Sequence, residues 1–392
     1  MNIRILAASD RNNYGDLLFP LVITKFIQQE NISYDKLENY GIIESNLSDV
    51  GALPTKNFNN LITNIKSSNS EELIIVAGGE VLGSDWLNIY RFLSPLASKI
   101  HKSLFLRRIL NRIDFVSLYF SLFKGSSFPF ILNKSPFTKK NVKVVYNSIG
   151  GSNIDKYLKK SNGLRRYFRN LAWLSVRDTK TKAAFDKFSV SNKLVPDSAL
   201  IMSDIFKTEL ETEISQEVRD LQHENYIYVQ LGNTKGPDDL DKFAHQLNQF
   251  AAGANVKIVL SPIGLALDHD DEIILRKLQA KCPGSAYLHP NNIYDTMALL
   301  KNAKMYIGTS LHGVVTSQSF NIPFVAFTEK IKKLDLYIKT WFNNSSQVSL
   351  DYKDFAKVNE VYSNFNRGEA NRILQQQKKE IYDNLYKIFL NG

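Results

Sequence analysis

Short apolar stretches alternate with small-residue loops and helical patterns along the first half of the chain. Stretches of strand length occur at Ile3–Ala8, Leu73–Val76, Val142–Ser148 and Leu174–Val176, and a polar or glycine-containing loop follows each of them. Strands that alternate with helices form a parallel sheet with helices on both faces. The pattern therefore predicts an α/β domain, resembling a Rossmann fold, over residues 1–206.

The same order returns after a polar, acidic stretch at roughly 207–224. Four further strands are expected, at Tyr226–Leu231, Lys257–Ser261, Ala286–Leu288 and Met305–Ile307. These strands predict a second α/β domain over residues 207–350. The tail, residues 351–392, carries apolar residues at helical spacing and is expected to form an amphipathic helix that packs back on the first domain.

Length and composition agree with a folded enzyme of two domains. The chain has 392 residues, of which 44% are hydrophobic and 22% are charged. Its single cysteine, Cys282, excludes an intramolecular disulfide and every multi-cysteine metal site. The apolar run at the N-terminus is short for a signal peptide, and no apolar run reaches the roughly 18 residues that span a bilayer. We expect a cytoplasmic protein.

The formal net charge of +10 is concentrated in one segment. Residues 99–143 hold ten Lys or Arg and one acid, Asp114, interleaved with eight aromatic residues. This mixture favours an anionic membrane surface, which would make the protein peripheral at the inner face of the plasma membrane. A helical insertion at about 99–141, with core aromatics and solvated lysines, explains the pattern equally well. We expect no nucleic acid as a partner, because no zinc finger, RNP motif or convincing helix-turn-helix is present.

The strongest chemical signal lies where the strand Met305–Ile307 turns directly into a helix. Free amides at a helix N-terminus stabilise an anion such as phosphate, and Thr309, Ser310 and Leu311 occupy that turn. His312 follows at once, so it would lie beside the anion and could exchange a proton with it near neutral pH. A histidine that merely caps or packs the helix start is the alternative.

Two further side chains follow strands of the first domain. Arg177 comes directly after a strand and could bind a carboxylate or phosphate bidentately, or could pair with its neighbour Asp178. Asp16 lies at the first strand-to-helix turn, where it either caps the helix or holds a sugar. We take Asp16, together with His312, as a candidate catalytic residue. Arg177 is a candidate for binding the donor, the substrate that supplies the transferred group.

Six residues are candidates for binding an acceptor sugar. Five of them lie near these turns and one lies in the second domain. They are Asn13, Gly15, Gly78, Gly79, Glu80 and His269. Glycines allow the backbone to approach a ligand closely, although a pair of them is equally a tight turn. His269 lies in an acid-rich loop that could suggest a metal, but carboxylates that cap the next helix explain this loop more simply. We expect no metal. No P-loop, G-x-G-x-x-G, G-x-S-x-G or H-E-x-x-H motif occurs.

Six short motifs occur in order along most of the chain: Asn13-Tyr14-Gly15-Asp16, Gly78-Gly79, Ser175-Val176-Arg177-Asp178, Val195-Pro196-Asp197, Asp268-His269-Asp270-Asp271 and Gly308-Thr309-Ser310-Leu311-His312-Gly313. In this order they resemble the polysaccharide pyruvyl transferase family. The resemblance implies two Rossmann-like domains facing a cleft, as in the GT-B glycosyltransferases. It also implies transfer of the pyruvyl group of phosphoenolpyruvate to a glycan or lipid-linked sugar as a pyruvate ketal, with no cofactor.

The resemblance also assigns roles. Arg177, Thr309, Ser310, Leu311 and Gly313 would bind the donor, and His312 would be the general acid or a phosphate partner.

Many family members have arginine where this chain has Ser310. The serine and its amides, or a cation such as Lys235, would then have to replace that arginine's charge.

Two rival functions stay open at this point. A glycosyltransferase that uses a nucleotide sugar could share the scaffold, although the helix after His312 lacks the acid that such enzymes often use for the ribose. A membrane-associated scaffold that has lost donor binding is the non-enzymatic alternative, and both Ser310 and the basic-aromatic insertion motivate it.

Overall fold

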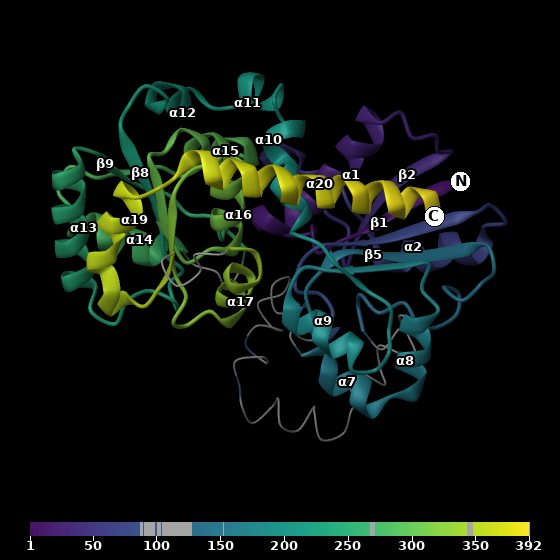
Figure 1. Ribbon diagram of the computed structural model, residues 1–392. Coiled ribbons are helices and arrows are strands. Elements are labelled where there is room, and N and C mark those ends of the chain that lie inside the picture. Colours follow the sequence, from purple (N-terminus) through teal and green to yellow (C-terminus); the bar gives the residue numbers. More distant parts are fainter. Residues whose placement is uncertain are drawn as a thin grey trace.

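The computed structural model describes residues 1–86, 89, 99, 103, 128–151, 153–266, 271–342 and 348–391. Within these ranges the chain forms two entirely parallel sheets, each with helices on both faces (Figure 1). The predicted fold class, two α/β domains, is therefore confirmed. Most of the basic segment at 99–143, and His269 with its neighbours, lie outside the described residues.

The first sheet has the strand order β3-β2-β1-β4-β5-β6-β7. Its strands are β1 (Asn2–Leu6), β2 (Lys36–Gly41), β3 (Lys56–Asn57), β4 (Glu72–Ala77), β5 (Val142–Ile149), β6 (Trp173–Val176) and β7 (Lys193–Leu194). Helix α1 (Tyr14–Gln29) covers one face. The other face packs against α2 (Phe58–Ser67), α7 (Ile154–Lys160), α8 (Asn162–Arg169) and α9 (Thr179–Asp186).

The second sheet has the order β10-β9-β8-β11-β12-β13. Its strands are β8 (Tyr226–Gln230), β9 (Lys257–Leu260), β10 (Ala286–Tyr287), β11 (Met305–Gly308), β12 (Phe324–Phe327) and β13 (Ser349–Leu350). Helices α13 (Leu240–Ala254) and α14 (Asp271–Gln279) pack on one face. Helices α15 (Ile293–Asn302), α16 (Leu311–Ser319) and α17 (Lys332–Trp341) pack on the other.

Short elements connect and extend the two sheets. They are η1 (Ser48–Val50), η2 (Ser198–Ile201), α10 (Met202–Ile205), α11 (Glu209–Thr212), α12 (Gln216–Leu221), η3 (Tyr352–Lys357), α19 (Val358–Ser363) and the long C-terminal α20 (Arg367–Asn391). No helix in the described part of the chain is long and apolar enough to cross a membrane.

The facing sides of the two domains share one hydrophobic core. Alternate residues of β1 point into it together with α1, and α15 and α16 of the second domain complete it. The hydroxyl groups of Tyr14 and Thr316 hydrogen-bond across this boundary at 2.9 Å. Because α1 and α16 are packed in one core, the first turns of these two helices are held in a fixed relation, and these turns carry Asp16 and His312.

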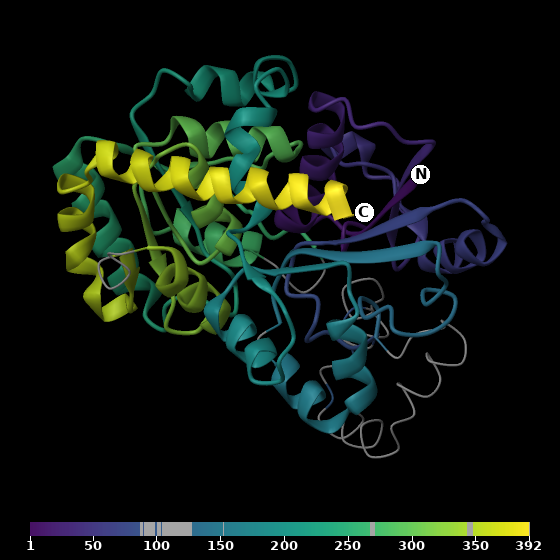
Figure 2. The ribbon, with the colours of Figure 1, turned by 45° about the vertical axis from the view of Figure 1, so that its right-hand side comes forward.

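Helix α20 lies along both domains (Figure 2). Its Asn384 accepts a hydrogen bond from the indole of Trp173 at 2.8 Å, and its buried Lys378 contacts Asp204 at 2.6 Å. Phe389 stacks on Phe26 of α1 with 5.9 Å between the ring centroids. The C-terminal helix, which follows the second domain in sequence, therefore packs back against the first domain.

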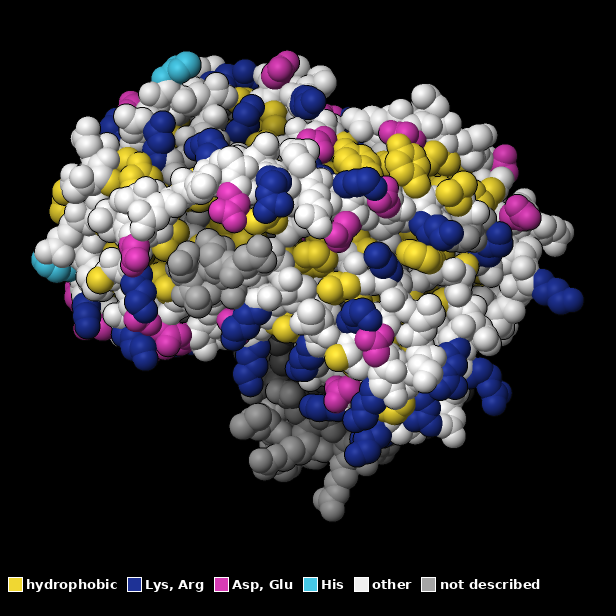
Figure 3. Space-filling model, in the orientation of Figure 1, with side chains coloured by type: hydrophobic (Ala, Val, Ile, Leu, Met, Phe, Trp, Pro, Cys, Tyr) yellow, Lys and Arg dark blue, Asp and Glu magenta, His cyan; other side chains and the backbone are white. Residues whose placement is uncertain are grey.

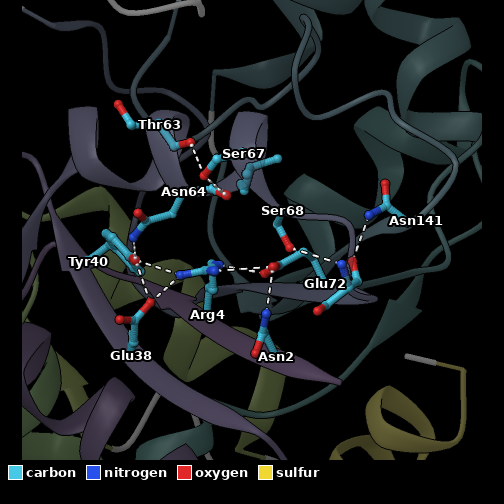
Figure 4. A network of polar contacts seen from close by, with 12 residues as sticks. Asn2, Arg4, Glu38, Tyr40, Thr63, Asn64, Ser67, Ser68, Glu72 and Asn141 are labelled. Atoms are coloured by element: carbon cyan, nitrogen blue, oxygen red, sulfur yellow. Dashed lines mark hydrogen bonds and ion pairs between the residues drawn. The ribbon is translucent and has the colours of Figure 1, made fainter.

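A buried polar network ties the strands of the first sheet on the α2 side (Figure 4). The Arg4 guanidinium donates to Glu72 at 2.5 Å and to the Tyr40 hydroxyl at 2.7 Å, and it also pairs with Glu38. Burial opposes the ionisation of Glu72, but Arg4 and other donors hold its pKa below the usual range. This explains how β2, a strand with charged residues, belongs to the sheet.

Candidate active site

A cavity of about 600 Å³ lies between the domains, at the carboxyl ends of the strands. Loops after β1, β4 and β6 form one wall, and loops after β8, β9 and β11 with the start of α17 form the other. Open α/β sheets bind ligands at this edge. Ten of the predicted site residues line the cavity: Asn13, Asp16, Gly79, Glu80, Arg177, Lys235, Thr309, Ser310, Leu311 and His312.

His312 lies in the first turn of α16, and its imidazole is mostly enclosed. Its Nε2 atom is buried without a hydrogen-bond partner among the described residues and lies 3.8 Å from Asp197 Oδ2. Burial lowers the pKa of His312 below the ordinary value, with Arg177 and Lys333 adding to the effect, while Asp197 and Asp16 oppose it. The imidazole is therefore mostly neutral at pH 7.

The first domain shapes the pocket for this ring. The Phe19 ring meets the imidazole edge-on with centroids 5.5 Å apart. A Cβ atom at Gly15 would lie 1.8 Å from His312 Nδ1, so only glycine leaves room for the imidazole there. Gly15 was predicted to contact the acceptor. In the structure it packs against His312, a candidate catalytic residue of the other domain.

Arg177 is the most strongly paired cation of the cavity. Its guanidinium donates to Asp197 at 3.0 Å and lies 3.4 Å from Glu80, and its side chain is only 4% exposed. Burial opposes its charge, yet Asp197 and Glu80 hold the pKa of Arg177 above its ordinary value. The indole of Trp341 fixes the backbone by donating to the Arg177 carbonyl at 2.8 Å. Two carboxylates thus balance this guanidinium before any ligand arrives.

The sequence offered Asp178 as an alternative partner for Arg177, but this residue has a different role in the structure. Its carboxylate accepts from the Thr181 amide at 2.7 Å and from the Thr181 hydroxyl at 2.9 Å. It therefore caps helix α9. The acidic partners of Arg177 come instead from loops that are distant in sequence.

The turn between β11 and α16 is tightly hydrogen-bonded. Thr309 Oγ1 accepts from the Gly232 amide at 2.8 Å, and Ser310 Oγ accepts from the Gly313 amide at 3.3 Å. Thr309 and Ser310 were predicted to bind the donor substrate. In the structure their hydroxyl groups hold this turn of the cavity wall in place. The amides of Leu311 and His312 have no acceptor within the described residues, so they are the groups free to bind an anion.

Glycines allow the walls to pack closely. Gly78 and Gly79 have φ values of +53° and +76°, and a Cβ at Gly78 would lie 2.1 Å from the Phe19 ring. Gly313 packs in the same way, because a Cβ there would lie 2.3 Å from the Tyr306 ring. Gly15, Gly78 and Gly313 lie behind the cavity surface. They contribute to the site by leaving room for the neighbouring aromatic and imidazole rings.

Acids and amides dominate the remaining first-domain wall. Asn13 precedes α1, and its side-chain amide donates to Asp16 at 2.6 Å. Asp16 lies in the first turn of α1 and faces the cavity with Glu80. These groups offer carboxylate and amide oxygens to a ligand.

Lys235 and Lys333 line the opposite wall. Neither side chain has an ion pair with any part of the chain that the structure describes. Lys333, the second residue of α17, is an exposed residue that lines the cavity. Desolvation by the cavity walls lowers the pKa of Lys333 to about 8, and repulsion from Lys235 and Arg177 adds to this shift.

Sequence reasoning assigned no role to three residues of this site, Asp197, Asp271 and Lys333. Asp197 follows β7 and belongs to the Val195-Pro196-Asp197 motif, which was a usable signal. Asp271 Oδ2 accepts from Gln230 and from the amides of Gly264 and Ile263, and burial raises its pKa to about 6. Lys333 follows another lysine at a helix start, a pattern typical of solvated surface. Within the described ranges, no group of three or more His, Cys, Asp or Glu side chains could hold a metal ion.

The profile of the family described as "Polysaccharide pyruvyl transferase" matches residues 13–330. This range contains all the described residues that line the cavity except Ala8, Arg11 and Lys333. The chain belongs to the polysaccharide pyruvyl transferase family. The predicted resemblance is thereby confirmed. A search of curated proteins gives no match.

Solved structures similar to this pyruvyl transferase family member share its architecture. UDP-GlcNAc 2-epimerase from Neisseria meningitidis, bound to UDP-GlcNAc, has a TM-score of 0.54 and 10% identity over 99% of this chain and 100% of the other. The Methanocaldococcus jannaschii UDP-GlcNAc 2-epimerase has a TM-score of 0.55 and 11% identity over 96% and 99%. At such identities the likeness shows the fold alone, a GT-B-like pair of domains.

Proposed function

We propose that this transferase moves the pyruvyl group of phosphoenolpyruvate onto a sugar of a cell-surface polysaccharide or of its lipid-linked precursor, with formation of a pyruvate ketal. Family membership supports pyruvyl transfer to a polysaccharide. The observation that carries the proposal is the place of His312. A buried imidazole, without a hydrogen-bond partner at Nε2 in the described structure, lies where free amides and lysines face a wall of carboxylates.

The donor suits the second-domain wall by charge. Phosphoenolpyruvate carries a phosphate and a carboxylate, and it needs cations, amide donors and a proton donor. The amides of Leu311 and His312 and the ammonium group of Lys235 supply the first two. An anion bound there would raise the lowered pKa of His312 and give it a proton to transfer. Asp197, 3.8 Å from Nε2, would stabilise the protonated ring.

The reaction can then proceed in two bond-forming steps. His312 protonates the methylene carbon of the donor, and a sugar hydroxyl oxygen bonds to the adjacent carbon and loses its proton. A second hydroxyl of the same sugar displaces the phosphate from that carbon and closes the ketal. Of the two hydroxyl protons, one restores His312 and the other leaves with inorganic phosphate.

The acceptor suits the first-domain wall. Sugar hydroxyls bind well to carboxylate and amide groups, which Asp16, Glu80 and Asn13 present there. Asp16 is our candidate base for the attacking hydroxyl, because it faces the cavity and is held by the Asn13 side chain at 2.6 Å.

A lipid-linked acceptor would require the enzyme to reach a membrane surface. Exposed lysines and arginines gather over α7 and α8 (Figure 3). They include Lys156, Lys159, Lys160, Arg166 and Arg169. This surface would add to the positive charge of residues 99–143 in attracting anionic lipids. Sedimentation with anionic and neutral vesicles tests this: we expect binding to the anionic ones, and equal binding to both would refute membrane recruitment.

The test of the proposed function is release of inorganic phosphate from phosphoenolpyruvate with a panel of glycan acceptors. We expect acceptor-dependent release that falls by about 10²–10⁴ in His312→Ala. His245→Ala is the matched control, because His245 is an exposed residue of α13 and should leave the rate unchanged. No release with any acceptor, combined with binding of a nucleotide sugar such as UDP-GlcNAc, would favour the glycosyltransferase alternative.

A further inference from the structure

Among the residues that the structure describes, four cationic side chains line the cavity, and two of them are balanced by acidic or carbonyl partners. Arg177 lies between Asp197 and Glu80. Arg11 pairs with Asp10 at 3.2 Å and donates to the Ala8 carbonyl at 3.1 Å. Neither arginine therefore offers much uncompensated charge to an incoming anion. The two lysines of the opposite wall differ from them in this respect.

Lys333 is placed to meet a ligand. It is the second residue of α17, and the next residue, Leu334, is fully buried and anchors this turn in the core. The Lys333 side chain lines the cavity, where Lys235 and Arg177 repel its charge and where Glu80 and Asp16 attract it. Desolvation by the cavity walls lowers its pKa to about 8, and the repulsion adds to this shift. A bound anion would relieve the repulsion.

The neighbouring helix start completes an anion site on this side. The free amides of Leu311 and His312 face the same cavity as both lysines. Ser310 brings no charge, because its hydroxyl caps α16. A phosphate monoester carries close to two negative charges at pH 7, whereas a carboxylate carries one. Two unpaired ammonium groups and two amides match the phosphate better than the carboxylate.

We propose that Lys333 and Lys235, with the α16 amides, form the phosphate-binding subsite of the donor, and that Lys333 is its principal cation. This inference deepens the proposed function and rests on it for the identity of the donor. Its role would continue through the reaction, since the same ammonium group would stabilise the phosphate as the bond to carbon breaks.

The test compares four proteins by calorimetric titration with phosphoenolpyruvate and with inorganic phosphate at pH 7. They are the wild type, Lys333→Gln, Lys333→Arg and the control Lys332→Gln. Lys332 is the exposed neighbour on α17 and does not line the cavity. We expect Lys333→Gln to weaken both ligands at least about tenfold, and Lys332→Gln to change them by less than about twofold.

The pH dependence separates a charge contact from a structural role. Above pH 7 the donor phosphate stays doubly charged, so a loss of affinity for phosphoenolpyruvate between pH 7 and 9 reports the lysine. We expect this loss in the wild type, since Lys333 loses its proton near pH 8. Lys333→Arg should keep its affinity through this range, because arginine stays charged.

The outcomes distinguish the subsite from the proposed reaction. Wild type that does not bind phosphate, or Lys333→Gln that binds it as the wild type does, would overturn the subsite even if pyruvyl transfer is observed. Phosphate binding that depends on Lys333, without phosphate release for any acceptor, would support the subsite as an anion site and overturn the reaction.

Discussion

The two walls of the cavity carry opposite chemistry. The first-domain wall presents Asp16, Glu80 and Asn13, and its arginines are paired within the protein. The second-domain wall presents two lysine side chains and the amides of Leu311 and His312 at the start of α16, and none of these groups has a partner in the described part of the chain. A neutral sugar suits the first wall and a doubly charged donor suits the second. The contrast supports the proposal of one substrate for each domain, with His312 between them.

Arg177 and Lys333 show that a cation in a cavity can have either of two functions. Arg177 is buried between two carboxylates and connects β6 to the loops that carry Glu80 and Asp197. Lys333 has no such partners in the described part of the molecule. The first cation contributes to the folded structure, and the second is available to a ligand.

Replacing these two cations should give the largest contrast. Arg177→Met leaves Asp197 buried without its ion pair, so we expect the free energy of unfolding to fall by about 3–5 kcal/mol. Lys333→Met removes an unpaired charge and should leave the stability unchanged or slightly higher. Urea unfolding of both variants measures this. Equal losses in the two variants would show that the distinction between them is wrong.

Gly15→Ala should disturb the catalytic ring with little damage to the fold. The new Cβ would occupy the place of the imidazole, 1.8 Å from Nδ1, so His312 must move. We expect kcat to fall by about 10²-fold, as for other small misplacements of catalytic groups. Gly253→Ala is the control, since a Cβ there meets nothing within 4 Å. A Gly15→Ala variant with unchanged kcat would show that the position of His312 does not control the rate.

Asp271 should give the smallest effect, visible as a pH dependence. Its folded-state pKa is raised from 3.8 to about 6, so the folded protein binds more protons than the unfolded chain between these values. Stability from this group is therefore present at low pH and is lost as the pH rises through 6. Relative to Asp271→Asn, the wild type should lose about 1 kcal/mol between pH 5 and 7. A pH-independent difference in unfolding experiments would contradict the raised pKa.

Much of the fold followed from local patterns. Strands β1, β4, β8 and β11 are mostly apolar and are buried along their length, so their sequences identify them directly. Strand β2 was missed, because Lys36 and Glu38 resemble a surface segment until Arg4 is seen to pair with Glu38. Strands β3, β7 and β13 have only two residues each and carry little pattern.

The site was predictable where its chemistry is local. His312 and the α16 amides follow from a strand that turns directly into a helix. The partners of Arg177 did not follow, since Glu80 and Asp197 lie 97 and 20 residues away in sequence, and the adjacent Asp178 caps α9 instead. Lys333 enters the site only because α17 starts at the cavity, a fact of tertiary structure that its own sequence does not reveal.

The most direct test of the division between the walls is a crystal structure of the protein with phosphoenolpyruvate and without acceptor. We expect the phosphate to lie within hydrogen-bonding distance of the Lys333 ammonium group and of the Leu311 and His312 amides, with the ion pair of Arg177 and Asp197 intact. A phosphate bound to Arg177, with Asp197 and Glu80 displaced from it, would contradict the account.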